Sequence, residues 1–203
     1  AEALARFGAV DVLVNNAGVM PLAYFADHAQ ALERWHRAID INIKGVVNGI
    51  AAVYDQMIAQ GRGQVVNISS IYGNAAIVGA GVYSATKAAV TTLSDALRME
   101  SKGRITVTTV KPTGVAGTNL AGGIVNYEAI NGIVGVRRET FEHNLGAMLA
   151  GELPPELTDP DSVRYWLITP DDLADAVVHV IDQPWGISIS DITVRASGED
   201  YLY

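Results

Sequence analysis

Short runs of β-branched and aliphatic residues alternate along this chain with long amphipathic segments, and this alternation restricts the folds open to it. The apolar runs fall at residues 10–14, 64–69, 104–112 and 187–197. Helical periodicity lies between them, over about residues 29–60, 81–101 and 169–181. Strands separated by helices of ten or more residues are typical of parallel βαβ units with helices on both faces of the sheet. We therefore expect an α/β fold with a doubly wound parallel sheet in a three-layer α/β/α arrangement.

The composition fits one globular domain over residues 1–203, with no repeat or interdomain linker. Of the 203 residues, 49% are hydrophobic, which is enough apolar material for a real core. The formal net charge is −8 and no basic run occurs, so neither nucleic acid nor an anionic membrane is expected as a partner. No apolar run approaches the roughly 18 residues that a membrane span needs.

Cysteine and histidine usage argues against a metal centre. The chain has no cysteine, which excludes disulfides, thiolate metal sites and a cysteine nucleophile. Its four histidines show no ligand spacing, so we expect no metal; they are His28, His36, His143 and His179.

Small and polar residues follow each of the first three expected strands. The first run is followed by Asn-Asn-Ala-Gly at residues 15–18, the second by Ser69 and Ser70, and the third by Pro112 and the residues up to Val115. Ligands of parallel α/β sheets bind at the carboxyl ends of the strands. We therefore expect these segments to meet in one polar crevice.

Tyr83 and Lys87 stand four residues apart in the sequence YSATK, so on a helix they share one face. A Tyr-x-x-x-Lys pair taken alone is most often a solvated helix pair. A free tyrosine has a pKa near 10, and acid–base work close to pH 7 needs a fall of about three units. A lysine one turn away shifts the pKa of the phenol in that direction. The pair therefore predicts a general acid/base, Tyr83, and a cation that tunes it.

Taken together, these motifs resemble the short-chain dehydrogenase/reductase family. The matching residues are Asn-Asn-Ala-Gly at 15–18, Asn42 in IDINIKG, Ser70 in VNISSIYG, and Tyr83 with Lys87. The resemblance covers nearly the whole chain and weakens between about residues 120 and 168. It implies a Rossmann-like sheet and a catalytic set of Asn42, Ser70, Tyr83 and Lys87. The closing SDITVRAS is similar to the subgroup of NADP-linked 3-hydroxy acid and serine dehydrogenases.

The resemblance also implies a nicotinamide cofactor, NADP or NAD, with NADP slightly favoured. Lys87 is expected to hold the nicotinamide ribose, and Asn42 to kink its helix and anchor a water that leads to Lys87. Ser70 is expected to hydrogen-bond the substrate oxygen and stabilise charge there. The full set of expected cofactor-binding residues is Asn16, Ala17, Gly18, Tyr83, Lys87, Pro112, Gly114, Val115 and Thr118.

Two features depart from the family pattern. No glycine-rich phosphate loop is present, and the sheet is expected to lack its first strands, which leaves an apolar strand edge facing water. By analogy about three strands and their helices, on the order of 70 residues, precede Ala1 in a complete member. Without them, a silent scaffold or a dinucleotide-sensing protein is the competing hypothesis, and an epimerase or dehydratase is a further enzymatic one. Thr113 also stands where the family usually has glycine. Its branched side chain would be strained at positive φ, so either Gly114 adopts that geometry or the nicotinamide pocket differs.

Residues 118–168 are expected to cover the substrate, as loops beyond strand ends do. The segment holds several aromatics and few cations, which favours a small or medium-sized, mostly apolar alcohol or ketone; packing of the segment itself is an equally good explanation of the aromatics. Family resemblance implies a homodimer or homotetramer through the two long helices. A cytoplasmic location is expected.

Overall fold

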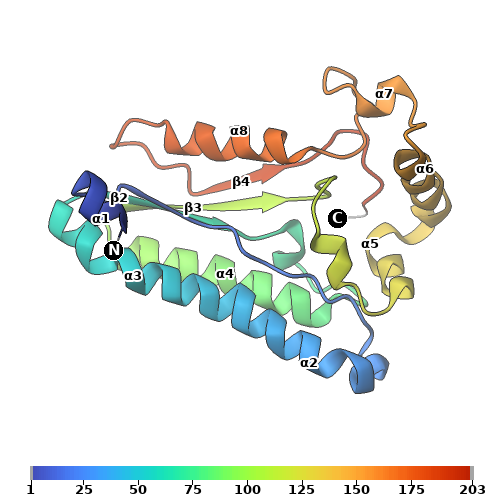
Figure 1. Cartoon of the computed structure of the whole chain (residues 1–203), viewed down its shortest axis with the longest axis horizontal. Helices are drawn as coiled ribbons and strands as arrows, with labels where there is room; N and C mark the ends of the chain where they lie inside the picture. Colours follow the sequence, from blue (N-terminus) through green and yellow to red (C-terminus); the bar gives the residue numbers. More distant parts are fainter. Residues whose placement is uncertain (1, 202–203) are drawn as a thin grey trace.

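Four parallel strands form the sheet of this protein in the order β1-β2-β3-β4. The structure is a computed structural model that describes residues 2–201. The strands are β1 (Val12–Asn15), β2 (Gly63–Ile68), β3 (Ile105–Pro112) and β4 (Asp191–Val194). All of them point the same way, so their carboxyl ends share one edge (Figure 1). The expected parallel sheet is confirmed.

Helices cover both faces of this sheet (Figure 1). One face carries α2 (His28–Ile39), α3 (Gly45–Gln60) and α4 (Gly81–Glu100), and the other carries α8 (Pro170–Ile181). Successive residues of a strand point to opposite faces. Accordingly Val65 packs with Met57 of α3 on one side, whereas Val66 packs with Val180 of α8 on the other. This alternation produces the three expected layers.

The first expected strand is not buried on both faces, and it exposes an apolar edge as expected. It forms β1, which is only partly buried, and Val14 is 41% exposed. Among the described residues β1 pairs only with β2, so its other edge is unpaired. A strand at the edge of a sheet lacks the neighbour that would bury its second side. In the described part of the chain this apolar strand therefore lies at an edge of the sheet.

The long helix expected over residues 29–60 is present, with a π-helical turn inside it. The turn, Asp40–Lys44, joins α2 to α3 without ending the helix. π-helical turns within α-helices occur frequently at functional sites. Gly61 then ends α3 with φ of 73°, a left-handed conformation that glycine adopts without strain.

Helix α4 lies directly against the segment that follows β2. That segment contains a short 3-10 helix, Ile71–Gly73. A Cβ atom added to Gly73 would lie 2.8 Å from the backbone carbon of Lys87, so only glycine permits this approach. The close packing of Gly73 on α4 holds Ser70 near the side chains of that helix.

Short helices gather beyond the carboxyl ends of β3 and β4 (Figure 1). The helix expected over residues 140–149 is confirmed as α6 (Arg138–Ala150), and it is preceded by α5 (Asn131–Val134) and followed by α7 (Pro155–Thr158). The remaining elements are α1 (Glu2–Phe7) and the 3-10 helices Phe25–Asp27, Leu120–Gly123, Tyr127–Ile130 and Gly135–Arg137. This group stands where a cover over the strand ends would be.

The expected cap at the start of α8 is confirmed, whereas the last strand is shorter than expected. Thr169 and Asp172 form a reciprocal capping box, so the acidic residues at this terminus have a structural role. The apolar run at residues 187–197 contributes only β4. The residues just before β4 form isolated hydrogen bonds to β3 rather than a ladder. One of these bonds runs from Thr108 Oγ1 to Ile189 O at 2.7 Å.

Candidate active site

The segments that follow the first three strands meet in one hollow at the carboxyl edge of the sheet. Its volume is about 740 Å³. Residues from after β1, after β2, after β3 and from α4 line it together; among them are Asn16, Ala17, Gly18, Ser69, Ser70, Tyr83, Lys87, Pro112, Thr113, Val115 and Thr118. The predicted crevice is confirmed.

Tyr83 and Ser70 form the polar centre of this hollow. Tyr83 lies in the first turn of α4 and is almost wholly buried, and its hydroxyl is hydrogen-bonded to the Ser70 side chain. Ser70 Oγ also accepts the backbone N–H of Tyr72 at 3.2 Å, which fixes the serine rotamer. Two hydroxyl groups from different elements therefore point at the same place, where both can contact one oxygen atom of a ligand.

The protein groups around Tyr83, Lys87 included, do not by themselves lower its pKa toward neutrality. Burial raises the pKa of Tyr83 to about 12, and the hydrogen bond from Ser70 only partly opposes that rise. Lys87 Nζ lies 5.8 Å from the centre of the Tyr83 ring. Desolvation of the phenolate thus outweighs the attraction of the lysine, and Tyr83 is a neutral phenol at pH 7.

Lys87 is itself buried beside the loop that follows β1. Its ammonium donates a hydrogen bond to Ile68 O at 2.9 Å. Burial lowers the pKa of Lys87 to about 8, because charge is costly away from water. A Cβ atom added to Gly18 would lie 3.4 Å from Nζ, so the loop passes close over the lysine. The remaining donor positions of the ammonium are available to a ligand in the hollow.

Asn42 holds the loop after β1 in place. It lies in the π-helical turn and is almost fully buried. Its Oδ1 accepts the N–H of Val19 at 2.9 Å, and its Nδ2 donates to Val19 O and to Thr86 Oγ1, also at 2.9 Å each. Thr86 in turn donates to Tyr83 O. The expected distortion of the helix at Asn42 is therefore present, and its side chain joins the loop to α4.

The two asparagines at the carboxyl end of β1, Asn15 and Asn16, have different roles. Asn16 lines the hollow, whereas Asn15 Nδ2 donates to Asn67 Oδ1 at 2.8 Å and so ties β1 to β2. Asn67 then donates to Ser94 of α4. Gly49 of α3 makes room for this network, because a Cβ atom there would lie 2.2 Å from Asn15 Oδ1. The roles of Asn67 and Gly49 could not be predicted from the sequence, since they depend on contacts between distant elements.

Gly114 departs from its expected role. Neither Gly114 nor Thr113 has a positive φ, so the suggestion that Gly114 adopts the strained geometry is wrong. Instead, a Cβ atom on Gly114 would lie 2.4 Å from the Tyr201 hydroxyl and 2.5 Å from Leu167 Cδ2. Glycine is required there because side chains pack onto its backbone. Among the described residues lining the hollow, Thr113 and Val115 are present and Gly114 is not.

Helix α8 contributes an apolar wall that sequence reasoning did not assign to the site. Leu173, Ala174 and Val177 line the hollow opposite Val14 of β1. Their spacing of three and four residues was visible in the sequence, but it is equally typical of core packing. The hollow is thus polar at Tyr83 and apolar along α8.

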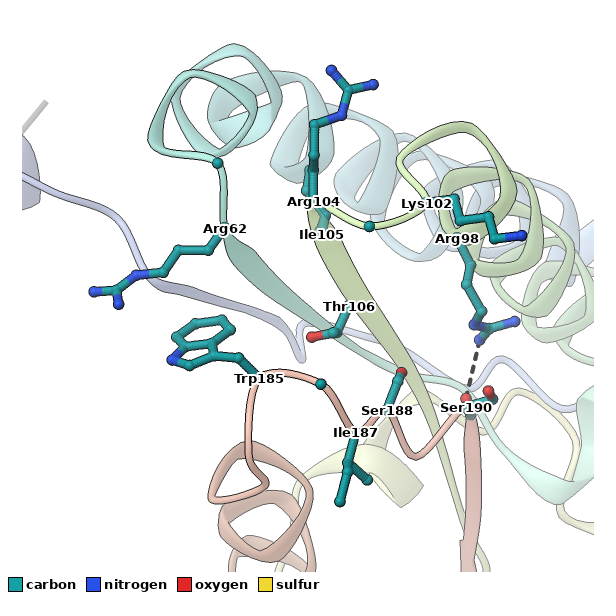
Figure 2. Close-up of a pocket in the computed structure, with 13 residues that line it drawn as sticks. Arg62, Arg98, Lys102, Arg104, Ile105, Thr106, Trp185, Ile187, Ser188 and Ser190 are labelled. Atoms are coloured by element: carbon teal, nitrogen blue, oxygen red, sulfur yellow. Dashed lines mark hydrogen bonds between the residues drawn. The ribbon is translucent and has the colours of Figure 1, made fainter.

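A second hollow, of about 590 Å³, lies at the opposite edge of the sheet, near the amino ends of the strands. Several basic residues line it, but Figure 2 shows Arg62, Lys102 and Arg104 directed away from one another. Arg62 lies over the Trp185 ring, and Arg98 donates to Ser190 O at 3.0 Å. These cations are spread or engaged within the chain rather than converging on one ligand. The hollow beside Tyr83 is therefore the candidate active site.

The fold is a Rossmann-like α/β/α sandwich, and comparison with known proteins identifies its family. The family model described as short chain dehydrogenase matches residues 1–129. An uncharacterised oxidoreductase of Listeria innocua is 35% identical over 192 residues, which is 95% of this chain and 67% of that protein. The chain belongs to the short-chain dehydrogenase/reductase family of oxidoreductases.

Solved structures agree with this assignment. The closed form of a serine dehydrogenase complexed with NADP+ superposes with a TM-score of 0.73 at 28% identity, over 100% of this chain and 73% of that one. An alcohol dehydrogenase from the archaeon Thermococcus sibiricus, complexed with 5-hydroxy-NADP, gives a TM-score of 0.72 at 21% identity, over 100% of this chain and 69% of that one. The second likeness concerns the fold alone.

Proposed function

We propose that this protein is an NAD(P)-dependent oxidoreductase that interconverts an alcohol and a ketone, with Tyr83 as general acid/base. The observation that carries the proposal is the hydrogen bond between the Tyr83 and Ser70 hydroxyls inside the hollow beside Lys87. A carbonyl oxygen between these two hydroxyls would receive a hydrogen bond from each. The same contacts stabilise an alkoxide as negative charge grows on that oxygen.

The residues of the hollow fit the nicotinamide end of a dinucleotide cofactor. Gly18 has no side chain, so its backbone lies close to the buried Lys87 ammonium. The N–H groups of the ammonium that do not bond Ile68 O can donate to ribose hydroxyls. Asn16 and Ala17 would contact the same sugar, while Pro112, Val115 and Thr118 border the place of the ring. When bound, the nicotinamide supplies or accepts the hydride. Binding of NADP+ by the related serine dehydrogenase supports NADP over NAD.

Each polar residue then has a distinct task. Tyr83 donates its proton to the substrate oxygen in reduction and takes it back in oxidation. Ser70 orients the carbonyl through its hydroxyl, and Lys87 holds the ribose and provides positive charge next to Tyr83. Asn42 acts through Val19 and Thr86, as a positioning residue. The water that Asn42 is expected to anchor stays a prediction.

The raised pKa of Tyr83 predicts how the two directions depend on pH. Reduction needs the protonated phenol, which is present throughout pH 6–8 if its pKa is about 12. Oxidation needs the phenolate, whose population rises about tenfold per pH unit below the pKa. We therefore expect kcat/KM for oxidation to rise with a slope of about one logarithmic unit per pH unit between pH 6 and 8, while reduction stays flat.

Initial rates followed at 340 nm, with the protein expressed from its complete reading frame, test this. The range stops near pH 8 because Lys87, with a pKa of about 8, loses its charge above it. An oxidation rate that is already level above pH 7 would contradict a pKa controlled by burial. It would indicate instead that Lys87 governs Tyr83 in the working enzyme.

Residues 118–168 are proposed to cover the substrate. Phe141 and Trp166 from this segment pack in the same cluster as Tyr83, which supports the proposal. We further propose a homodimer or homotetramer that uses the outer faces of the long helices, and a cytoplasmic location. Within residues 2–201, no helix is both long and apolar enough to cross a membrane.

A further inference from the structure

Ser69 carries a buried hydroxyl that has no part in the proposed reaction. The residue directly follows β2, is 2% exposed and lines the hollow next to Ser70. Its Oγ donates a hydrogen bond to the backbone oxygen of Lys87 at 2.8 Å. A serine hydroxyl has one proton, so this bond leaves Ser69 no donor for a ligand. The hydroxyl therefore acts within the protein, on the lysine of the candidate site.

Lys87 is held at both of its ends by two consecutive residues. Its ammonium donates to Ile68 O at 2.9 Å, and its backbone oxygen accepts the Ser69 hydroxyl. Ile68 ends β2, and the Ser69 N–H donates to Val110 O of β3 at 2.8 Å, so this anchor belongs to the sheet. A lysine side chain is a flexible four-carbon stem, which by itself does not fix the position of its charge. Because the backbone and the tip are tied to one strand end, the ammonium is confined to one place.

The backbone oxygen of Lys87 is enclosed by other groups as well. Thr91 Oγ1 donates to the same oxygen at 3.3 Å and lies 3.3 Å from Ser69 Oγ. A Cβ atom on Gly73 would lie 2.9 Å from that oxygen, so the turn that follows β2 packs directly onto it. Ser69, Gly73 and Thr91 thus converge on one carbonyl group, and that group belongs to the lysine of the site.

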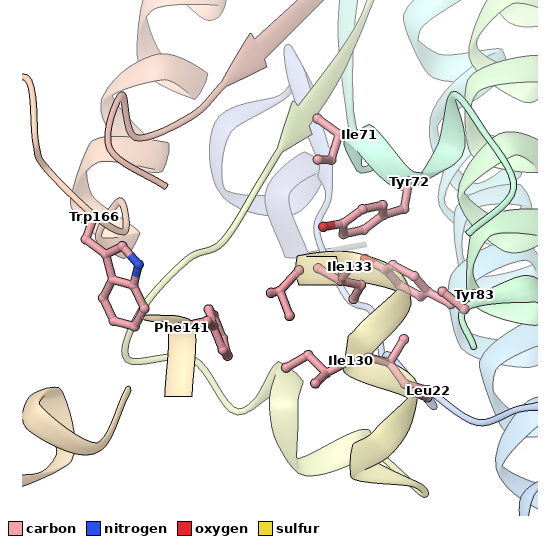
Figure 3. Close-up of a cluster of buried hydrophobic side chains, with 11 residues drawn as sticks. Leu22, Ile71, Tyr72, Tyr83, Ile130, Ile133, Phe141 and Trp166 are labelled. Carbon is pink, nitrogen blue, oxygen red and sulfur yellow. The ribbon is translucent and has the colours of Figure 1, made fainter. Parts of the chain in front are cut away.

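The segment after β2 cannot shift along α4, because its next residues are buried. Figure 3 shows Ile71 and Tyr72 in the apolar cluster that also contains Tyr83. Ser70, which follows Ser69, is hydrogen-bonded to the hydroxyl of Tyr83. The same strand end therefore sets the positions of both ionisable side chains of the site.

We propose that Ser69 is a positioning residue, whose hydroxyl holds the backbone of Lys87 so that the ammonium points at the ribose of the nicotinamide cofactor. This role rests on the proposed function, because it requires that Lys87 binds that ribose. Without the hydroxyl, the lysine keeps its bond to Ile68 O, but its backbone is no longer fixed to the strand end. The cofactor should then bind less tightly, whereas the contacts of Ser70 and Tyr83 with the substrate oxygen should remain.

Ser69→Ala, expressed from the complete reading frame, tests this role through binding of NADP+ alone. Isothermal titration calorimetry should give a dissociation constant about tenfold higher than that of wild type, the change expected for one lost hydrogen bond. In steady-state reduction of 4-hydroxy-2-butanone, KM for NADPH should rise by about the same factor, while KM for the ketone stays unchanged. Ser69→Cys, which places a weak donor of similar shape there, should change NADP+ binding in the same direction.

The Lys87→Met background separates positioning from a general structural role. If the Ser69 hydroxyl acts through Lys87, Ser69→Ala has no further effect on NADP+ binding in a chain that already carries Lys87→Met. An equal loss of affinity in both backgrounds would show that Ser69 acts on the fold and not on the lysine, and would overturn the inference.

Ser101→Ala is the matched control. Ser101 is fully buried at the opposite end of α4 from Tyr83, and its hydroxyl donates to Leu97 O at 2.6 Å. Loss of this bond should lower the melting temperature and leave the affinity for NADP+ at the wild-type value. A Ser69→Ala protein that binds NADP+ as tightly as Ser101→Ala does would overturn the inference and leave the proposed function in place.

The assays of turnover and of binding distinguish failure of the two proposals. If wild type reduces no ketone but binds NADP+ with an affinity that depends on Ser69 through Lys87, the proposed function is wrong and the positioning role holds. If wild type binds neither NADP+ nor NAD+, both are overturned.

Discussion

Tyr83→Phe lowers kcat/KM for ketone reduction by about 10²–10⁴-fold, the usual contribution of a positioned general acid. The ring stays in place within its apolar cluster, and only the hydroxyl that bonds Ser70 is lost. Folding should therefore be little affected, with a loss of about 1 kcal/mol for one hydrogen bond. Reduction followed at 340 nm and the far-ultraviolet circular dichroism of the variant measure the two effects.

The control for this variant is Tyr54→Phe. Tyr54 lies on α3 in the cluster on the far side of the sheet from α8, away from the candidate site. The Tyr54→Phe variant should retain full activity. If Tyr83→Phe reduced ketones as well as Tyr54→Phe, Tyr83 would not be the acid, and the assignment of the reaction centre would be wrong.

Lys87→Met is expected to stabilise the fold while lowering activity about 100-fold, because the positive charge beside Tyr83 is lost. Burial lowers the pKa of Lys87 in the folded protein from its ordinary value of 10.5 to about 8. Below pH 8 the buried ammonium is charged in the folded state at a cost of about 3 kcal/mol, since each pKa unit corresponds to about 1.4 kcal/mol. Methionine fills similar space without a charge. Loss of the hydrogen bond to Ile68 O destabilises the variant by about 1 kcal/mol and offsets part of the gain.

The lowered pKa of Lys87 also predicts that the stability of the fold rises with pH. Between about pH 8 and 10.5 the unfolded chain holds the Lys87 proton and the folded chain does not, so the contribution of this lysine to stability rises with pH. Urea denaturation at pH 7 and pH 9 should show this rise in wild type and a smaller one in Lys87→Met. Lys102→Met, at an exposed lysine, is the matched control and should behave as wild type. A less stable Lys87→Met protein with full activity would contradict both roles of Lys87.

Much of the fold could be predicted because local signals agree with the tertiary structure. The β-branched run before Asn67 and the Ala-rich periodicity around Lys87 each specify their own element. The polar residues of the site could be placed together because parallel strands bring their carboxyl ends to one edge. Asn42, Ser70, Tyr83 and Lys87 do lie at that edge.

What the sequence could not predict depends on contacts between distant segments. The need for glycine at position 114 depends on a contact with Tyr201. The direction of the Tyr83 pKa shift could not be predicted for the same reason. The spacing of Tyr83 and Lys87 is visible in the sequence, but the degree of burial that outweighs the lysine is not.

Isotope transfer from the cofactor tests the reaction most directly. The protein, expressed from its complete reading frame, is incubated with NADPH deuterated at the transferring position of nicotinamide C4 and with 4-hydroxy-2-butanone. Mass spectrometry of the product should find one deuterium on the new carbinol carbon in wild type and almost no product in Tyr83→Phe. Product alcohol without deuterium, or equal labelled product from both proteins, would contradict hydride transfer at a centre built on Tyr83.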